Sequence, residues 1–156
     1  MKTLEFIMIL EKWLIIFASF FWIYQMVICL FSFVKEKEKA KIVNKNHKFM
    51  AVISARNEEG VIGNLIKSLK EQNYPKELLD VYVIADNCTD NTAEIAKNAG
   101  AIVYERFDEE KKTKGFALQW FLAQKIKEDA PYDAFCIFDA DNVADKNFLK
   151  AMNKKL

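Results

Sequence analysis

The pattern of apolar and polar positions divides the chain into an apolar N-terminal run, a lysine-rich stretch and a longer region of mixed character. From Trp13 to Val34 the sequence carries no charged residue. A helix of that length rises about 33 Å, which matches the roughly 30 Å hydrocarbon core of a bilayer. We therefore expect residues 1–34 to form a membrane anchor helix and residues 35–48 to form a basic juxtamembrane linker.

Two other interpretations of the apolar run are a buried helix of a soluble protein and a cleaved signal peptide. The rest of the chain has too little surface to cover such a helix on all sides, and no small-residue cleavage site follows the run. Lysines are frequent in residues 35–48, whereas Lys2 and Lys12 precede the run. By the positive-inside rule, this asymmetry predicts a single-pass membrane protein whose C-terminal region faces the cytoplasm and whose lysines contact lipid headgroups of the bilayer.

From Phe49 onward, short apolar runs alternate with segments whose apolar residues recur at helical spacing. The former predict buried strands and the latter predict helices. The predicted strands are Phe49–Ala55, Leu79–Ala85, Ala101–Glu105 and Ala134–Asp139, and the predicted helices are Glu59–Glu71, Thr92–Ala99 and Lys114–Glu128. This alternation indicates an α/β fold with a mostly parallel sheet covered by helices on both faces. We assign residues 49–156 to one such domain.

Two of the predicted helices carry further signals. In the first, the residues expected to face the core are Ile62, Leu65, Ile66 and Leu69. The second is expected to be capped by Asp90 or Asn91 and closed by Gly100.

Composition narrows the range of partners. The formal net charge of +1 argues against nucleic acid as a main partner, because no strongly basic region is present to neutralise phosphates. Cys29, Cys88 and Cys136 have neither zinc-ligand nor C-x-x-C spacing, so we expect free thiols.

Polar residues follow three of the predicted strands, at the carboxyl ends where parallel sheets bind ligands. The sharpest group is Asp139-Ala140-Asp141. Two carboxylates at one strand end can share a hard divalent cation such as Mg²⁺ or Mn²⁺, and that cation can bridge to a diphosphate. A pair of solvated turn residues is the alternative, and the local sequence alone does not separate the two.

Two further groups suggest ligand contacts. Asp86 ends the second predicted strand, where its carboxylate can accept a nucleobase N–H, whereas helix capping accounts for residues 90–92. Lys114 begins a predicted helix, whose N-terminus attracts anions, and Gly115 lets the backbone approach a ligand. We expect residues 111–112 to be solvated loop lysines.

Four segments in this order resemble the family 2 glycosyltransferases: V-I-S-A-R-N-E-E, A-D-N-C-T-D-N-T-A, K-T-K-G-F-A-L and F-D-A-D-N. The resemblance covers residues 49–156 and implies a Rossmann-like nucleotide-binding fold of the type called GT-A. It also implies a reaction in which an acceptor hydroxyl attacks the anomeric carbon of a nucleotide-sugar, commonly a UDP-sugar, with inversion. A membrane helix ahead of a cytoplasmic catalytic domain occurs in members that make surface polysaccharides.

The resemblance also implies roles for individual residues. The nucleoside pocket would be lined by Ala55, Arg56, Asn57 and Glu58, the base would be bound by Asp86, and the ribose or diphosphate would lie against Lys114 and Gly115. Asn87 and Ala140 would belong to the same nucleotide-sugar site. Asp139 would contact the ribose or the metal, and Asp141 would coordinate the metal. Family members take a general base from an acidic motif farther along the chain, so no catalytic residue is assigned. We expect weak or absent transfer by these residues alone.

Three alternatives stay open at this point. One is an inactive nucleotide-binding remnant, and another is a subunit completed by a second chain that supplies the acceptor half. The third is a phosphatase of the haloacid dehalogenase type, because residues 138–143 fit its Asp-x-Asp signature with Asp139 as nucleophile. That signature normally opens its domain, whereas here it closes the chain, which favours the transferase. A sheet that ends at residues 134–139 is also expected to expose an edge suited to association.

Overall fold

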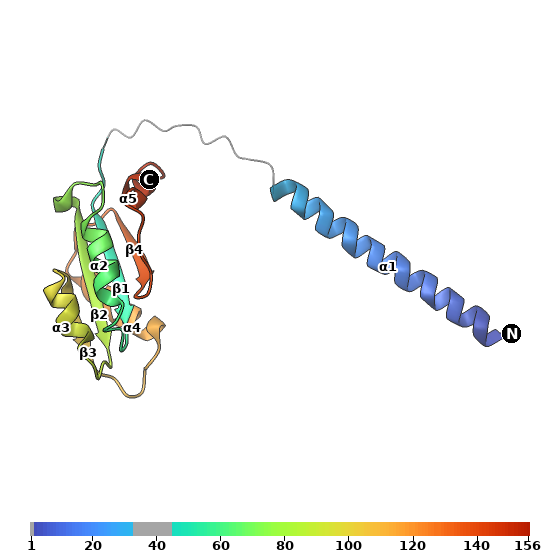
Figure 1. The fold of residues 1–156 in the computed structure, drawn as a ribbon, viewed down its shortest axis with the longest axis horizontal. Coiled ribbons are helices and arrows are strands. Elements are labelled where there is room, and N and C mark those ends of the chain that lie inside the picture. Colours follow the sequence, from blue (N-terminus) through green and yellow to red (C-terminus); the bar gives the residue numbers. More distant parts are fainter. Residues whose placement is uncertain (1, 33–44) are drawn as a thin grey trace. The chain divides into compact units, whose positions relative to one another are not determined.

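The structure is a computed structural model that describes residues 2–32 and 45–156 (Figure 1). It divides into two compact units, with the boundary at residue 40. The first unit contains helix α1 (Lys2–Ser32). Val34 and most of the predicted linker fall in residues 33–44, which lie outside the described residues.

From Trp13 onward, helix α1 carries no charged residue on any side. The segment Glu5–Phe31 has a mean hydropathy of 2.3 and is long enough to cross a membrane, and none of it is buried within the described chain. A helix that is hydrophobic on all sides is typical of a membrane span. A signal sequence meets the same criteria of length and composition, so the anchor and its orientation stay predictions.

The second unit is built on a four-stranded parallel sheet, as predicted. Its strands are β1 (Phe49–Ala55), β2 (Leu79–Asp86), β3 (Ile102–Arg106) and β4 (Ala134–Asp139), in the order β3-β2-β1-β4. The register pairs Ser54 of β1 with Ile84 on one side and with Asp139 on the other. The carboxyl ends of β1, β2 and β4 therefore lie side by side.

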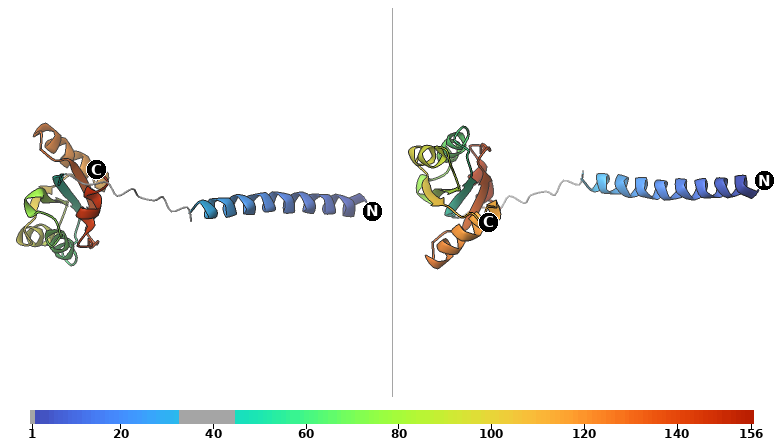
Figure 2. Two further views of the ribbon diagram at one scale, coloured as in Figure 1. Left: turned by 90° about the horizontal axis from the view of Figure 1, so that it is seen from above. Right: turned by 90° about the horizontal axis from the view of Figure 1, so that it is seen from below.

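Alternate residues of each strand point to opposite sides of the sheet, so both faces carry apolar side chains, and helices cover both faces. Figure 2 shows α4 on one side of the sheet and α2 and α3 on the other. The helices are α2 (Ile62–Lys70), α3 (Thr92–Asn98), α4 (Lys114–Lys127) and α5 (Phe148–Asn153), with a short 3-10 turn at η1 (Lys76–Leu78). Under α4, Met50 and Val52 pack with Phe121, whereas the opposite face buries Phe49 and Ile53 against α2.

The first predicted helix begins later than its sequence pattern indicates, at Ile62 rather than Glu59. The carbonyl oxygen of Glu58 accepts the N–H groups of both Val61 and Ile62, so residues 58–61 form a turn. The carboxylate of Glu59 is directed to the backbone N–H of Asn91 instead. The expected core face is confirmed, since the buried residues of α2 are Ile62, Leu65, Ile66 and Leu69.

Of the two residues predicted to cap α3, Asp90 provides the cap. Asn91 is the N-cap residue but its side chain makes no capping hydrogen bond. Asp90 supplies the acceptor, because its Oδ1 atom receives both the backbone N–H and the hydroxyl of Thr92. Gly100 follows the helix with a φ of 87°, the left-handed conformation that closes helices most readily with glycine.

One face of strand β4 departs from the prediction that helices cover both sides of the sheet. Phe135 and Ile137 are 57% and 46% exposed, although both point to the side that carries α4. Helix α4 packs mainly over β2 and β1. Among the described residues, β4 also has one strand neighbour, β1, so the predicted open edge lies here.

A polar cluster at the opposite end of the sheet gives a test of pH-dependent stability. Tyr132 donates a hydrogen bond of 2.7 Å to Asp80, and the Lys48 ammonium lies 3.1 Å from the same carboxylate. Burial raises the pKa of Asp80. The hydrogen bond from Tyr132 and the charge of Lys48 together lower the pKa by more than burial raises it, so it lies below its ordinary value. Such a carboxylate stabilises the fold above its unfolded pKa of about 3.9, and the contribution is lost as the pH falls through the folded pKa.

Replacing Tyr132 with Phe is therefore expected to lower the free energy of unfolding by about 1 kcal/mol at neutral pH. The difference in the free energy of unfolding between the variant and the parent chain should shrink as the pH falls towards about 3, because a protonated Asp80 gains less from the Tyr132 hydrogen bond than the carboxylate does. Urea denaturation across this pH range measures it. Tyr74→Phe is the matched control, since the Tyr74 hydroxyl bonds to neutral acceptors, the carbonyl of His47 and the amide of Asn153. A Tyr132→Phe difference that stays constant with pH would contradict the assignment.

Candidate functional site

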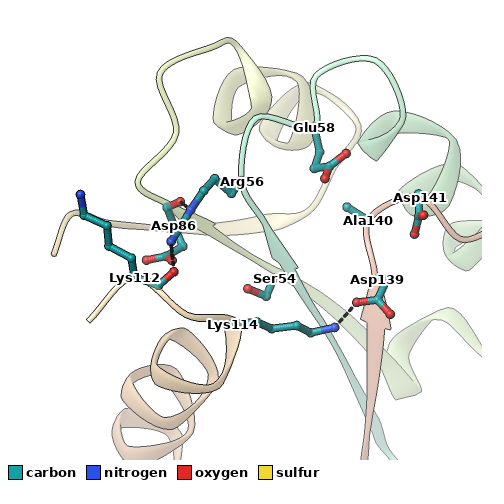
Figure 3. A pocket seen from close by; sticks show the side chains of 9 residues that line it. All are labelled: Ser54, Arg56, Glu58, Asp86, Lys112, Lys114, Asp139, Ala140 and Asp141. Carbon is teal, nitrogen blue, oxygen red and sulfur yellow. Dashed lines mark hydrogen bonds and ion pairs between the residues drawn. The ribbon is translucent and has the colours of Figure 1, made fainter. Parts of the chain in front are cut away.

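A cavity of about 380 Å³ lies where the carboxyl ends of β1, β2 and β4 meet the loop that precedes α4 (Figure 3). It is lined by Ser54, Arg56, Glu58, Asp86, Lys112, Lys114, Asp139, Ala140 and Asp141. The residues come from segments far apart in the sequence, and the parallel register of the sheet brings them together. Both charge signs face the same space, so the cavity can offer cations to an anionic ligand and carboxylates to a metal ion.

Most of the residues predicted from the sequence line this cavity. They are Arg56, Glu58, Asp86, Lys114, Asp139, Ala140 and Asp141. Ala55, Asn57, Asn87 and Gly115 are not among the lining residues. Ala55 is buried in the core beneath α2, which explains why its side chain is unavailable to a ligand.

Asn57 and Asn87 shape the two loops that follow β1 and β2. Both have positive φ, 57° and 52°, a conformation that asparagine tolerates better than most residues. The side-chain oxygen of Asn57 accepts the N–H of Thr89 at 2.8 Å, and that of Asn87 accepts the N–H of Asp108 at 2.8 Å. Each amide therefore ties its loop to a neighbouring one, and both act on the cavity through the backbone.

A network of two guanidinium groups surrounds Asp86, which is only 2% exposed. Its Oδ1 atom accepts from Arg106 at 2.5 Å and from Asn87 at 3.1 Å, and its Oδ2 atom accepts from Arg56 at 2.5 Å. A carboxylate offers about four lone-pair sites, so these three bonds leave room for one more donor. By this count, one acceptor site of Asp86 has no partner among the described residues.

Arg106 is part of this network although the sequence pattern did not single it out. It is 5% exposed and also donates to Asp108 at 2.7 Å. The sequence offered one indication of this role: Arg106 is a charged residue directly after the predicted strand, and in the structure it is the last residue of β3. Its burial depends on the strand pairing of Arg106 with Asp86, which no local pattern shows.

Two residues that line the cavity were not among the predicted site residues, Ser54 and Lys112. Ser54 is a polar side chain near the end of a buried strand, on the face shared with Met50 and Val52, so its period-2 position was an available signal. Lys112 was expected to be a solvated loop residue. Its carbonyl accepts a hydrogen bond from Arg56, while its ammonium pairs with Glu109. It thus contributes its backbone to the cavity.

Across the cavity, the Lys114 ammonium contacts the carboxylate of Asp139 (Figure 3). Lys114 is the first residue of α4, whose N-cap residue Thr113 accepts the N–H of Phe116. Asp139 is the last residue of β4, and Asp141 lies two residues farther on. The contact therefore joins two segments of regular structure on opposite sides of the cavity.

The carboxylate oxygens of Asp139 and Asp141 are of the kind that a hard divalent cation prefers, and an anionic ligand in the cavity could supply further oxygens. Asp139 and Asp141 both line the cavity. No cluster of three or more His, Cys, Asp or Glu residues that could hold a metal exists in residues 2–32 and 45–156. A cation here would thus take two protein carboxylates and complete its shell with ligand oxygens and water, as Mg²⁺ commonly does.

The fold and the cavity together define a parallel α/β domain of the nucleotide-binding type. The cavity lies where the chain, having placed β2 and β3 on one side of β1, returns to place β4 on the other, and such switch points bind ligands in open α/β sheets. Residues 50–156 match the glycosyl transferase family 2, and the chain belongs to that family. The haloacid dehalogenase alternative is therefore wrong.

Relatives and solved structures agree with this placement. A 4,4'-diaponeurosporenoate glycosyltransferase of Staphylococcus aureus is 44% identical over 72 residues, which make up 46% of this chain and 18% of that protein. The 1-349 segment of S. aureus TarS is 27% identical with a TM-score of 0.55, over 67% of this chain and 31% of that segment. TarS has also been solved in complex with UDP-GlcNAc, a match with a TM-score of 0.50 and 26% identity.

A third neighbour supports the fold alone. The mannosyltransferase PcManGT of Pyrobaculum calidifontis, solved with GDP-Man and Mn²⁺, matches with a TM-score of 0.64 at 19% identity, over 87% of this chain and 39% of that one. The GT-A type of α/β fold predicted from the sequence is confirmed.

Proposed function

We propose that the cavity binds the nucleotide-diphosphate part of a sugar donor, together with a divalent cation, for transfer of the sugar to an acceptor hydroxyl. The observation that carries this proposal is that Asp86, Lys114, Asp139 and Asp141 line one cavity at the carboxyl ends of the strands. Family membership and the UDP-GlcNAc complex of TarS support it. The cavity volume of about 380 Å³ falls within the range of small-molecule sites, about 300–1,000 Å³.

The charges divide the cavity into two regions with different partners. At one end, Asp86 is held by Arg56 and suits a nucleobase N–H. At the other end, Asp139 and Asp141 suit a cation, and Lys114 at the start of α4 suits a diphosphate oxygen. The ribose would lie between these regions, near Ser54.

In the proposed reaction, an acceptor hydroxyl attacks the anomeric carbon and the nucleoside diphosphate departs with inversion. A divalent cation supplies charge neutralisation for that leaving group. Lys114 and the N–H groups at the start of α4 add positive potential on the same side. Positioning the donor in this way is the contribution we assign to the described residues, and no general base is assigned among them.

The matched segment spans only 18% of the S. aureus relative, so transfer and its acceptor are proposed rather than assigned. General-base catalysis contributes about 10²–10⁴-fold, and the donor-binding role assigned to the described residues includes no such base. Nucleotide binding without turnover would favour a binding remnant. Turnover that appears only after a second chain is added would favour a split enzyme.

Calorimetric titration of the purified chain in detergent with UDP, with and without Mn²⁺, tests the proposal. We expect UDP binding that depends on Mn²⁺ and is at least tenfold weaker in its absence, since the cation bridges the carboxylates and the diphosphate. GDP and CDP titrated in parallel report on the base. Absence of binding to any of the three nucleotides at millimolar concentration, with Mn²⁺ present, would refute the proposal.

Gly115 gives a more local test of the donor position. A Cβ atom added there would meet only the hydroxyl of Thr113, at 3.8 Å, so Gly115→Ala should leave the free energy of unfolding unchanged or slightly higher. If the backbone contacts the diphosphate, the same change should weaken Mn²⁺-dependent UDP binding about threefold to tenfold. Gly60→Ala is the control, since no atom lies within 4 Å of its added Cβ and Gly60 belongs to the turn before α2 rather than to the start of α4. Equal UDP affinity for Gly115→Ala and the parent chain would contradict this position.

We also propose that α1 anchors the domain in a membrane, with the C-terminal region on the cytoplasmic side. The apolar segment Glu5–Phe31 and the lysines that follow it support this orientation. Labelling of Cys88 by a membrane-impermeant thiol reagent in intact and in opened cells tests it. Labelling only after the cells are opened is expected, and labelling in intact cells would place the domain outside.

A further inference from the structure

The ammonium group of Lys114 pairs with the carboxylate of Asp139, the same carboxylate that is proposed to bind the metal ion. Both side chains are partly exposed, 42% for Lys114 and 64% for Asp139, so the pair faces the open cavity rather than the core. Each belongs to a segment of regular structure, the first turn of α4 and the end of β4. The lysine therefore occupies part of the space in which a metal bound to Asp139 would lie.

The other cations that line the cavity are committed elsewhere. Arg56 bonds to Asp86 and to the carbonyl of Lys112, and the Lys112 ammonium pairs with Glu109. Within residues 45–156, Lys114 is thus the lining cation that meets a proposed metal ligand. It is also the one at the N-terminus of α4, next to the proposed position of the diphosphate.

We propose that Lys114 is an exchangeable counterion, which neutralises Asp139 while the site is empty and transfers to the donor diphosphate when the donor binds. This inference rests on the proposed function and adds a binding order to it. A metal alone must displace Lys114 and leave its ammonium without a partner. A metal that arrives with a diphosphate releases Asp139 and gives Lys114 a new anion at the same time.

The exchange makes metal and donor binding cooperative. Exposed ion pairs stabilise by up to about 1 kcal/mol, which corresponds to about fivefold in metal affinity. Cooperativity between two ligands is reciprocal, so each should raise the affinity of the other by the same factor. The cavity would then discriminate against free metal ions and in favour of metal-nucleotide complexes.

The test is whether Lys114→Gln raises the affinity for Mn²⁺ and lowers the affinity for UDP. In the chain purified in detergent, Lys114→Gln should bind Mn²⁺ alone about fivefold more tightly, because Asp139 is no longer neutralised. The same variant should bind UDP at saturating Mn²⁺ about tenfold more weakly, because a charge-assisted hydrogen bond to the diphosphate is lost. Electron paramagnetic resonance of free Mn²⁺ measures the first quantity, and calorimetry measures the second.

Lys111→Gln is the matched control, because it removes the same charge from the loop just before α4 and Lys111 does not line the cavity. Unchanged or weaker Mn²⁺ binding by Lys114→Gln would overturn the exchange, as would an equal gain in Mn²⁺ affinity for Lys111→Gln. If the parent chain binds no nucleotide, the proposed function fails, and the Mn²⁺ titration still decides whether Lys114 neutralises Asp139. If the parent chain binds UDP with Mn²⁺ and only the opposite effect is missing, the function stands and the exchange is wrong.

Discussion

Replacing Arg106 with Leu is expected to lower the free energy of unfolding by about 3 kcal/mol, the low end of the range for breaking a buried ion pair. Arg106 is 5% exposed and lies 2.5 Å from Asp86, which is itself buried. Without the guanidinium, the Asp86 carboxylate keeps Arg56 as its one cationic partner among the described residues. The low end is appropriate because that partner remains.

Urea denaturation at neutral pH measures the loss. Lys97→Met is the control, because Lys97 pairs with Glu105 beside the same strand but both side chains are about half exposed. That exposed pair should contribute less than about 1 kcal/mol. A loss for Arg106→Leu no larger than for Lys97→Met would show that Asp86 does not depend on Arg106. The double change Asp86→Leu with Arg106→Leu should be less destabilising than the sum of the single changes.

Replacing Asp141 with Asn is expected to weaken UDP binding in the presence of Mn²⁺ at least tenfold and to remove most of its dependence on the metal. The amide keeps the shape of the side chain but loses the charge that a hard cation requires. Asp141 is exposed, so the free energy of unfolding should stay within about 0.5 kcal/mol of the parent chain. The effect is thus expected on binding and not on folding.

Calorimetry with UDP at several Mn²⁺ concentrations gives both the affinity and its metal dependence. Glu94→Gln is the matched control, since it removes one exposed carboxylate from α3, outside the cavity. Asp139→Asn should resemble Asp141→Asn in the loss of metal dependence. UDP binding by Asp141→Asn with the same Mn²⁺ dependence as the parent chain would remove this residue from the metal site.

The strands were predictable because each is a short apolar run, although only β1 and β2 are buried on both faces. Phe49–Ala55 and Ala134–Asp139 were placed correctly, whereas β2 and β3 each end one residue later than predicted and β3 also begins one residue later. The extra residues at those ends, Asp86 and Arg106, are charged, so a hydrophobic pattern stops before them. Their strand pairing is stabilised by the ion pair between them, which is a tertiary contact.

The residues that line the cavity were largely predictable for a different reason. Polar groups just after buried strands converge at one edge of a parallel sheet, so a position in the sequence becomes a position in space. This argument holds for Asp86 and Asp139. It does not reveal which side chains already bind one another, such as Arg56 with Asp86 or Lys114 with Asp139, because those distances depend on helix placement. Helix α5 was also missed, since six residues carry too short a pattern to separate from a loop.

The most direct test of the account is nuclear magnetic resonance of the isotope-labelled chain in detergent, with UDP and substoichiometric Mn²⁺. Unpaired electrons of Mn²⁺ broaden the signals of nearby nuclei. The account predicts that the amide signals of Ala140, Asp141 and Lys114 broaden first, and that those of Phe49 and Leu79, at the far end of the sheet, persist. Broadening that begins at the far end, or that is the same with and without UDP, would contradict a shared metal and nucleotide site in the cavity.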